Sequence, residues 1–187
     1  MIRITAHDYD IEDGMDFARE VKAKGYKLSM NLAMSYCELG EYEKGMEIYE
    51  AIAAKTHPKY EADVAKAKEM MALYTNNKVA TMQEAGDFDG IIAMADAQLE
   101  KNPASALFQN VRLQAYANKK DYAKVIELGE AAAAAQTEAA DKSLMYYLLG
   151  AAYNAKEMKD QAIAAFQKVT DGPAAENAKA VLAELTK

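Results

Sequence analysis

The sequence predicts an all-α fold of stacked antiparallel helix pairs, and three observations support this prediction. Ala supplies 39 of the 187 residues, whereas Val and Ile together supply 16. Because Ala is the strongest helix former and β-branched residues favour strands, this balance argues against a sheet. Three Pro and nine Gly leave little material for turns, which favours a few long helices. The third observation is a repeat with a period of about 34 residues.

The charge balance narrows the classes of partner. There are 29 acidic and 22 basic residues, which give a formal net charge of −7. Only three of the basic residues are Arg, so no Arg cluster is available for phosphate binding, and a nucleic-acid partner is not expected. No window reaches the ~18 consecutive apolar residues of a membrane span, so no membrane insertion is expected. The single Cys37 excludes an internal disulfide. A monomer is favoured.

The N-terminal residues 1–25 predict a capping helix. Ile11, Met15, Ala18 and Val21 form an apolar stripe at helical spacing that ends at Gly25. Such a helix would shield the open face of the first repeat. No apolar run follows the first Arg, so a secretory signal is not expected in these residues, and the cellular compartment stays open.

Four blocks of the chain share one register. An aromatic residue follows a short turn in Gly40-Glu41-Tyr42, Gly86-Asp87-Phe88 and Lys120-Asp121-Tyr122. In every block, nine residues separate the residue closing the first helix from the one opening the second. The closing residues are Tyr36, Met82, Tyr116 and Tyr153, and the opening residues are Gly45, Ile91, Val125 and Ala162. An irregular helical bundle is the alternative, but a bundle does not require a fixed register.

The register divides the chain into consecutive elements. We expect repeat 1 at 26–58, an inserted helical extension at 59–71, repeat 2 at 72–105, repeat 3 at 106–142, repeat 4 at 143–173 and a C-terminal capping helix at 174–187. The extension predicts a helix from about Tyr60 towards Ala85, with a break considered at Asn76-Asn77. Arg112 occupies the position that Leu149 has in repeat 4. Because a charged residue replaces an apolar one there, the sequence does not predict how repeat 3 packs.

Small and large residues at fixed positions predict how each hairpin packs. Two helices approach closely only where one presents a small residue, such as Gly150 or Ala162, and a large residue of the partner fills the gap. We therefore expect four aromatic side chains to be largely buried. They are Tyr36, Tyr49, Tyr153 and Phe166.

The fourth block carries a resemblance to a known family. It contains Tyr146-x-x-Leu149-Gly150-x-x-Tyr153, then Ala162-x-x-x-Phe166, then Pro173. This resembles the tetratricopeptide (TPR) repeat, whose pattern is W-x2-L-G-x2-Y, then A-x3-F, then P. The resemblance covers roughly residues 26–173. It implies a single α-solenoid domain, a right-handed superhelix of helix pairs, whose first helices line a concave face that binds peptides or partner helices.

The resemblance also implies which residues line the concave face. Repeats 1 and 2 would contribute Lys27, Met30, Met34, Cys37, Leu73, Asn76, Ala80 and Gln83. Repeats 3 and 4 would contribute Leu107, Asn110, Gln114, Ala117, Leu144, Tyr147, Ala151 and Asn154. This lining is apolar with amides and holds almost no charge. Family members that grip a C-terminal carboxylate use Lys and Arg here, and only Lys27 is available, so that activity is not expected.

Sequence motifs for catalysis are absent. No phosphate-binding loop, dinucleotide fingerprint, nucleophile elbow or H-E-x-x-H occurs, and neither histidine pairs in sequence with Cys37. We therefore expect no enzyme, no cofactor and no metal. The segment from Asp8 to Gly14 starts like a calcium loop, but its Gly comes late and Arg19 replaces the bidentate Glu. Met30, Met34 and Cys37 could hold Cu(I), although packing is the preferred reading of such a stripe.

The function is therefore expected on a surface. The leading hypothesis is a non-enzymatic scaffold or adaptor that binds a peptide segment or partner protein on the concave face. Asn76, Asn110 and Asn154 would bond the ligand backbone, and apolar side chains would bury its side chains. The alternatives are an accessory or capping subunit that uses its outer face and terminal helices, and a small-ligand carrier with a pocket under residues 60–85. The groove could also be filled by the chain's own extension.

Overall fold

The computed structural model describes residues 30–187, with side chains from Ala33 onward. These residues form nine α-helices and one short 3-10 helix, and no β-strand occurs in that range. The prediction of an all-α fold is therefore confirmed for this part of the chain. The predicted N-terminal capping helix (1–25) and Lys27 lie outside the described residues.

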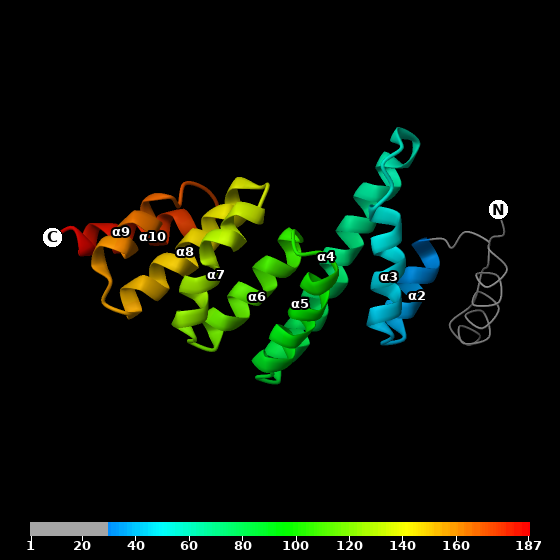
Figure 1. The fold of residues 1–187 in the computed structure, drawn as a ribbon, viewed down its shortest axis with the longest axis horizontal. Coiled ribbons are helices and arrows are strands. Elements are labelled where there is room, and N and C mark those ends of the chain that lie inside the picture. Colours follow the sequence, from blue (N-terminus) through cyan, green and yellow to red (C-terminus); the bar gives the residue numbers. More distant parts are fainter. Residues whose placement is uncertain (1–29) are drawn as a thin grey trace. The chain divides into compact units, whose positions relative to one another are not determined.

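The chain divides into two compact units, which meet in sequence between Lys78 and Val79. The described part of the first unit holds α2 (Met30–Glu38), α3 (Tyr42–Ala53), the 3-10 helix η1 (Pro58–Tyr60) and most of α4 (Glu61–Glu84). The second unit holds the end of α4 and then α5 (Phe88–Lys101), α6 (Ala106–Asn118), α7 (Tyr122–Ala135), α8 (Ala139–Ala155), α9 (Lys159–Gln167) and α10 (Ala174–Leu185). Figure 1 labels these helices in chain order.

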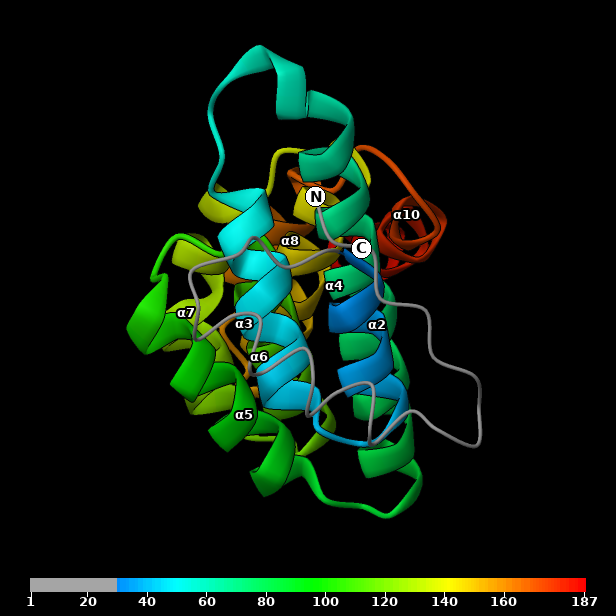
Figure 2. The same ribbon diagram turned by 90° about the vertical axis from the view of Figure 1, so that its right-hand side faces the viewer.

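The first unit is built on a helix hairpin. Helices α2 and α3 pack side by side (Figure 2). Gly45 makes this close approach possible, because a Cβ at that position would lie 2.8 Å from the carbonyl oxygen of Ala33. Helix α4 joins the hairpin through the hydroxyl groups of Tyr42 and Thr75, which are 2.7 Å apart and buried, and through Tyr74, whose ring stacks on that of Tyr49.

The two buried tyrosines of α3 give a matched prediction. Within the described part of the chain, the Tyr49 hydroxyl is buried without a hydrogen-bond partner. Tyr49→Phe should therefore leave the free energy of unfolding unchanged or raise it by up to about 1 kcal/mol. Tyr42→Phe should instead cost about 1–3 kcal/mol, because it leaves the buried Thr75 hydroxyl unpaired. Urea denaturation of both variants measures the difference. Equal losses would mean that the Tyr49 hydroxyl is bonded in solution.

Helix α4 runs without interruption from Glu61 to Glu84. The predicted helix from about Tyr60 towards Ala85 is thus confirmed, whereas the break considered at Asn76-Asn77 does not occur. The physical reason is the neighbouring Thr75, which is fully buried against α3 by its bond to Tyr42 and holds this turn in the helix.

In the second unit, every helix from α5 to α9 packs against the one that follows it. In addition, α6 packs against α8, and α8 packs against α10 (Figure 1). One core cluster joins α6, α7 and α8, and it contains Leu113, Val125, Ala132, Ala133, Met145 and Ala152. A second cluster is centred on α9 and α10, and it contains Ala162, Phe166, Val169, Ala174 and Ala178. The helix predicted at 174–187 is therefore present as α10 and covers α8 and α9.

The predicted aromatic core residues are confirmed in three cases of four. Tyr36, Tyr49 and Phe166 are buried, and a Cβ on Gly150 would lie within 3.0 Å of the Phe166 ring, as expected for a close crossing. The prediction for Tyr153 is wrong, because this side chain is only partly buried. It packs against the cluster of α9 and α10, which covers only part of its side chain.

Arg112 is accommodated in α6 by polar contacts. Its Nη1 donates to Asp96 Oδ1 on α5 at 2.9 Å, and its Nη2 donates to Gln109 Oε1 at 2.9 Å. The side chain is only 17% exposed, and its Nε is buried without a partner. Arg112 and Leu149 occupy the same position of the repeat. In α6 this position forms an ion pair with α5, whereas in α8 it holds a fully buried leucine.

The four hairpin turns share one backbone geometry. In each turn one residue has a positive φ, and the next residue donates its N–H to a carbonyl in the last turn of the first helix. The positive-φ residues are Gly40, Gly86, Lys120 and Glu157. The bonds run from Glu41 to Tyr36, Asp87 to Met82, Asp121 to Tyr116 and Met158 to Tyr153, at 2.8–2.9 Å. These four acceptors are the residues that the sequence predicts to close the first helices, but each helix runs two residues further, to Glu38, Glu84, Asn118 and Ala155.

Glycine in place of Lys120 or Glu157 should stabilise two of these turns. Lys120 and Glu157 hold φ values of 61° and 60°, a region that costs a side-chain-bearing residue about 1 kcal/mol. Lys120→Gly and Glu157→Gly should each raise the free energy of unfolding by up to about 1 kcal/mol. The higher conformational entropy of glycine in the unfolded chain offsets part of this gain. Lys156→Gly, one residue before Glu157 at a negative φ of −97°, is the control and should lower it. Thermal unfolding checks the sign, and a loss in all three variants would contradict the prediction.

Candidate interaction surface

The second unit carries the larger group of predicted site residues on two neighbouring helices. Along α6, Leu107, Asn110 and Gln114 are half-buried and recur at helical spacing. Along α8, Leu144 and Tyr147 are also half-buried, and Asn154 is exposed. Helices α6 and α8 pack against each other, and each opens a hairpin. We refer to this surface as the α6–α8 face: Leu107, Asn110, Gln114, Leu144, Tyr147 and Asn154.

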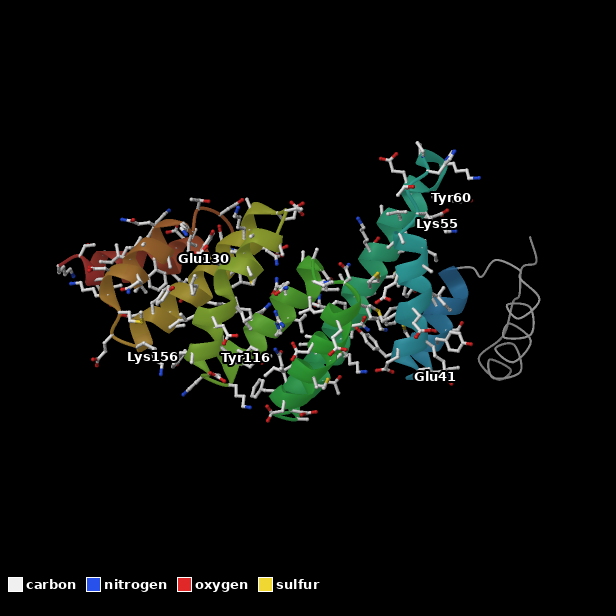
Figure 3. The ribbon with its side chains drawn as sticks, in the orientation of Figure 1. Glu41, Lys55, Tyr60, Tyr116, Glu130 and Lys156 are labelled. Carbon is white, nitrogen blue, oxygen red and sulfur yellow. The ribbon has the colours of Figure 1, made fainter. Side chains whose placement is uncertain are left out.

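The α6–α8 face is uncharged, and so is most of the two helices that form it. Helix α6 contains one charged residue, Arg112, which is paired with Asp96. Helix α8 has no charged residue from Ser143 to its end. Elsewhere in the second unit, α5, α7, α9 and α10 carry charged side chains. For example, Glu130 on α7, labelled in Figure 3, accepts hydrogen bonds from Lys168 at 2.9 Å and from the Tyr146 hydroxyl at 3.3 Å.

Two amides on the α6–α8 face bond to each other. The side-chain Nε2 of Gln114 donates to Oδ1 of Asn110, one helical turn earlier. This bond uses one lone pair of Asn110 Oδ1 and one of the two N–H groups of Gln114 Nε2. The Nδ2 group of Asn110 and the Oε1 atom of Gln114 have no hydrogen-bond partner in the described part of the chain. The pair therefore keeps N–H donors on both amide nitrogens and lone pairs on both amide oxygens.

Tyr147 lies at the edge of the face and contributes mainly to the fold. Its ring centroid is 5.7 Å from that of Phe166, with the two rings tilted by 60°. Tyr147 and Ala151 both pack against the core cluster of α9 and α10. Helices α9 and α10 thus cover part of the lining that the sequence assigns to a ligand, and the accessible lining on α8 is reduced to Leu144, part of Tyr147 and Asn154.

The first unit carries the remaining predicted residues. Met34 on α2 is 37% exposed and Leu73 on α4 is 48% exposed, while Asn76 on α4 is also exposed. Met30 is the first residue of α2, and its side chain lies outside the described ones. Gln83, near the end of α4, belongs to the second unit and is half-buried.

Cys37 is a half-buried thiol with a suppressed tendency to ionise. Burial, together with the charges of Glu38 and Glu43, raises its pKa to about 11. Burial likewise raises the pKa of Tyr42 and that of Tyr74 to about 12. At neutral pH these groups are protonated, so Cys37 is a weak nucleophile in this environment. The sequence does not indicate this cluster, because it joins residues of α2, α3 and α4 that lie 33 or more residues apart.

The other residues and segments considered for catalysis or metal binding are His57 and the calcium-like segment. His57 precedes η1, and its Nδ1 accepts a hydrogen bond from the backbone N–H of Lys59 at 3.2 Å. The calcium-like segment from Asp8 to Gly14 lies outside the described residues. Within residues 30–187, no three His, Cys, Asp or Glu side chains gather in a way that could hold a metal ion. In the same range, no helix is both long and apolar enough to span a bilayer.

Comparison with known proteins gives no relative from which a role could be transferred. A scan against protein-family models matches no family, and searches of curated proteins and of solved structures also return no match.

Proposed function

We propose that this protein is a non-enzymatic interaction module that holds a polypeptide segment on its α6–α8 face. One observation carries the proposal: two adjacent helices present a half-buried surface of leucine, amide and tyrosine side chains without a single charge. In a chain that is 27% charged, such a surface is unusual. Amides and apolar groups suit the main chain and uncharged side chains of a polypeptide, and they offer little to a phosphate or a carboxylate.

Repeated geometry supports a TPR-like solenoid as the framework. The same turn occurs four times at the positions of the register, and small residues mark the crossings at Gly129 with Leu149 and at Gly150 with Phe166. The contacts of α6 with α8 and of α8 with α10 are those expected when each hairpin stacks on the next. In this arrangement α10 acts as the C-terminal cap.

The proposed binding mode uses each part of the face. Leu107 and Leu144 would cover apolar side chains of the segment, and Asn110 and Gln114 would bond its main chain. The protonated Cys37 and the engagement of His57 Nδ1 in its own turn support a role without covalent catalysis.

The test begins with a selection of dodecapeptides from a random phage-displayed library against the immobilised full chain. We expect selected peptides to be poor in charged residues. Leu107→Asp and Leu144→Asp each place a charge on the face and should weaken the best peptide at least about tenfold. Ala131→Asp on α7 adds the same charge at an exposed position and is the matched control. Binding that tolerates both face variants, or is lost equally in the control, would contradict the proposal.

One observation favours a second candidate, an accessory subunit of a larger assembly. The described part of the first unit exposes three large apolar side chains, Met34, Leu39 and Leu73, at 37%, 40% and 48%. Exposed apolar side chains of this size suit a protein interface. Under this reading Leu73→Asp, but not Leu107→Asp, would abolish assembly with the native partner.

A further inference from the structure

The first helix hairpin of the protein carries an excess of negative charge. Residues 30–53, which form α2, α3 and the turn between them, contain five acidic residues and one basic residue. They are Glu38, Glu41, Glu43, Glu47, Glu50 and Lys44. Lys44 pairs with Glu41 of the turn, which is labelled in Figure 3. Lys78 of α4 pairs with Glu43 at 2.9 Å. These two ion pairs offset part of the charge and leave the hairpin negative.

The same hairpin exposes two large apolar side chains. Met34 on α2 is 37% exposed, and Leu39 in the turn is 40% exposed. Glu38 lies one helical turn after Met34, on the same side of α2. Glu38 and Glu43 both lie close enough to the Cys37 thiol to raise its pKa, so charges of α2 and α3 gather beside this apolar surface. A segment with both basic and apolar side chains is complementary to it.

The chain contains a segment of this kind directly before α2. Residues 17–27, which lie outside the described residues, contain four basic residues and one acidic residue. The basic ones are Arg19, Lys22, Lys24 and Lys27, and the large apolar ones are Phe17, Val21 and Tyr26. We propose that residues 17–27 dock on the α2–α3 hairpin through ion pairs with its glutamates and cover Met34 and Leu39. The chain itself then occupies the part of the first unit that suits an assembly interface.

Charge determines which part of the preceding chain docks. Residues 8–16 contain five acidic residues and no basic residue. Like charges repel, so the glutamates of the hairpin do not hold this stretch. The stretch also attracts residues 17–27, so the contact with the hairpin forms in competition with it. Whereas apolar periodicity predicts one cap over residues 1–25, the charges restrict the contact to residues 17–27.

The segment can reach the whole length of the hairpin. Lys22 lies eight residues before Met30, the first residue of α2. Eight extended residues span up to about 28 Å, whereas the 12 residues of α3 form a helix about 18 Å long. Because the segment and the hairpin belong to one chain, their effective concentration is high. Ion pairs that are individually weak can therefore hold the segment in place.

Hydrogen exchange of the full chain, followed by mass spectrometry at 0.1 M NaCl, tests this contact. One variant reverses three charges of the segment, by Arg19→Glu, Lys22→Glu and Lys24→Glu. Exchange of the backbone amides in α2 and α3 should become at least about threefold faster, because the docked segment suppresses local opening. At 1 M NaCl, where the Debye length is about 3 Å, the variant and the native chain should differ by less than about 1.5-fold.

The matched control reverses three exposed lysines of the second unit, by Lys142→Glu, Lys156→Glu and Lys159→Glu. It changes the net charge by the same amount and should leave exchange in α2 and α3 as it is in the native chain.

A charge exchange tests whether the hairpin is the partner of the segment. Glu38→Lys and Glu47→Lys, added to the reversed segment, restore opposite charges and should return exchange in α2 and α3 to within about twofold of the native chain. Both glutamates are exposed, so the substitutions bury no charge. The same two substitutions in the otherwise native chain should speed exchange, because they repel the basic segment.

Three results would overturn the inference. Equal exchange in the native chain and in the chain with the reversed segment would show that no contact exists. Faster exchange that the charge exchange does not restore would show that the reversal acts through other residues, such as 8–16. Protection that rises with protein concentration would place the segment on a second copy of the chain. None of these measurements involves the α6–α8 face, so the proposed function is tested separately.

Discussion

Replacing Gly150 by leucine should lower the free energy of unfolding of the second unit by about 1–3 kcal/mol or more. A Cβ at this position of α8 would lie 2.8–3.0 Å from three atoms of the Phe166 ring. That ring is 2% exposed and is enclosed by Tyr147 on one side and by the cluster of α9 and α10 on the other. Because it has no free space to move into, α8 and α9 must separate to admit the leucine side chain.

The matched control for Gly150→Leu is Ala155→Leu, at the exposed last position of the same helix. Leucine and alanine have similar helix propensities, so the control should shift the free energy of unfolding by less than about 0.5 kcal/mol. Urea denaturation followed by circular dichroism measures both variants. A midpoint unchanged by Gly150→Leu would show that Gly150 does not lie at a packed crossing.

Gly45→Ala should have a comparable effect in the first unit. The added Cβ would lie 2.8 Å from the backbone carbonyl oxygen of Ala33 and in contact with Cys37 Sγ. A backbone atom of the facing helix cannot rotate away, so α2 has to shift, at a cost of about 1–3 kcal/mol. This loss should exceed the gain of about 1 kcal/mol that Gly→Ala normally brings to a helix interior.

Cys37 provides a local readout of the Gly45→Ala effect. Displacement of α2 should expose the thiol and speed its reaction with a disulfide reagent at pH 8, relative to the native chain. The double variant Gly45→Ala with Cys37→Ala removes the thiol contact but leaves the carbonyl contact, so it should recover only part of the lost stability. Full recovery would show that the thiol, and not the backbone of Ala33, limits the approach of the two helices.

The sequence predicts the helices and turns of this protein well because their causes are local. Glycine or a polar residue at Gly40, Gly86, Lys120 and Glu157 adopts the left-handed conformation, and the register follows from the chain alone. The long helix α4 and the C-terminal helix α10 are likewise predicted from apolar periodicity.

What the sequence does not predict depends on contacts between distant residues. The bond of Tyr42 to Thr75 keeps α4 continuous, and the ion pair of Arg112 with Asp96 replaces an expected leucine contact. Neither partner can be identified from spacing in one chain. Similarly, Tyr147 is correctly placed on α8, but its contact with Phe166 follows from the position of α9, which sequence periodicity does not fix.

The sequence groups the residues of the α6–α8 face, but it does not predict how their side chains are bonded or exposed. Leu107, Asn110 and Gln114 stand together on α6 as expected, and periodicity is sufficient to group them. The bond between the two amides depends on their rotamers, which periodicity does not fix. Asn76 lies on the first unit and Asn154 is the exposed end of the row on α8, so the three asparagines are not equivalent.

The central claim is that an uncharged surface binds an uncharged segment, and the salt dependence of affinity tests it most directly. The measurement is the Kd of the best selected peptide for the full chain, by isothermal titration at 0.1 M and 1 M NaCl, where the Debye length falls from about 10 Å to about 3 Å. We predict that Kd changes by less than about threefold between the two salt concentrations, and that Leu107→Asp weakens binding at both of them. Binding that weakens more than about tenfold at 1 M NaCl and is indifferent to Leu107→Asp would contradict the claim and place the site among the charged helices.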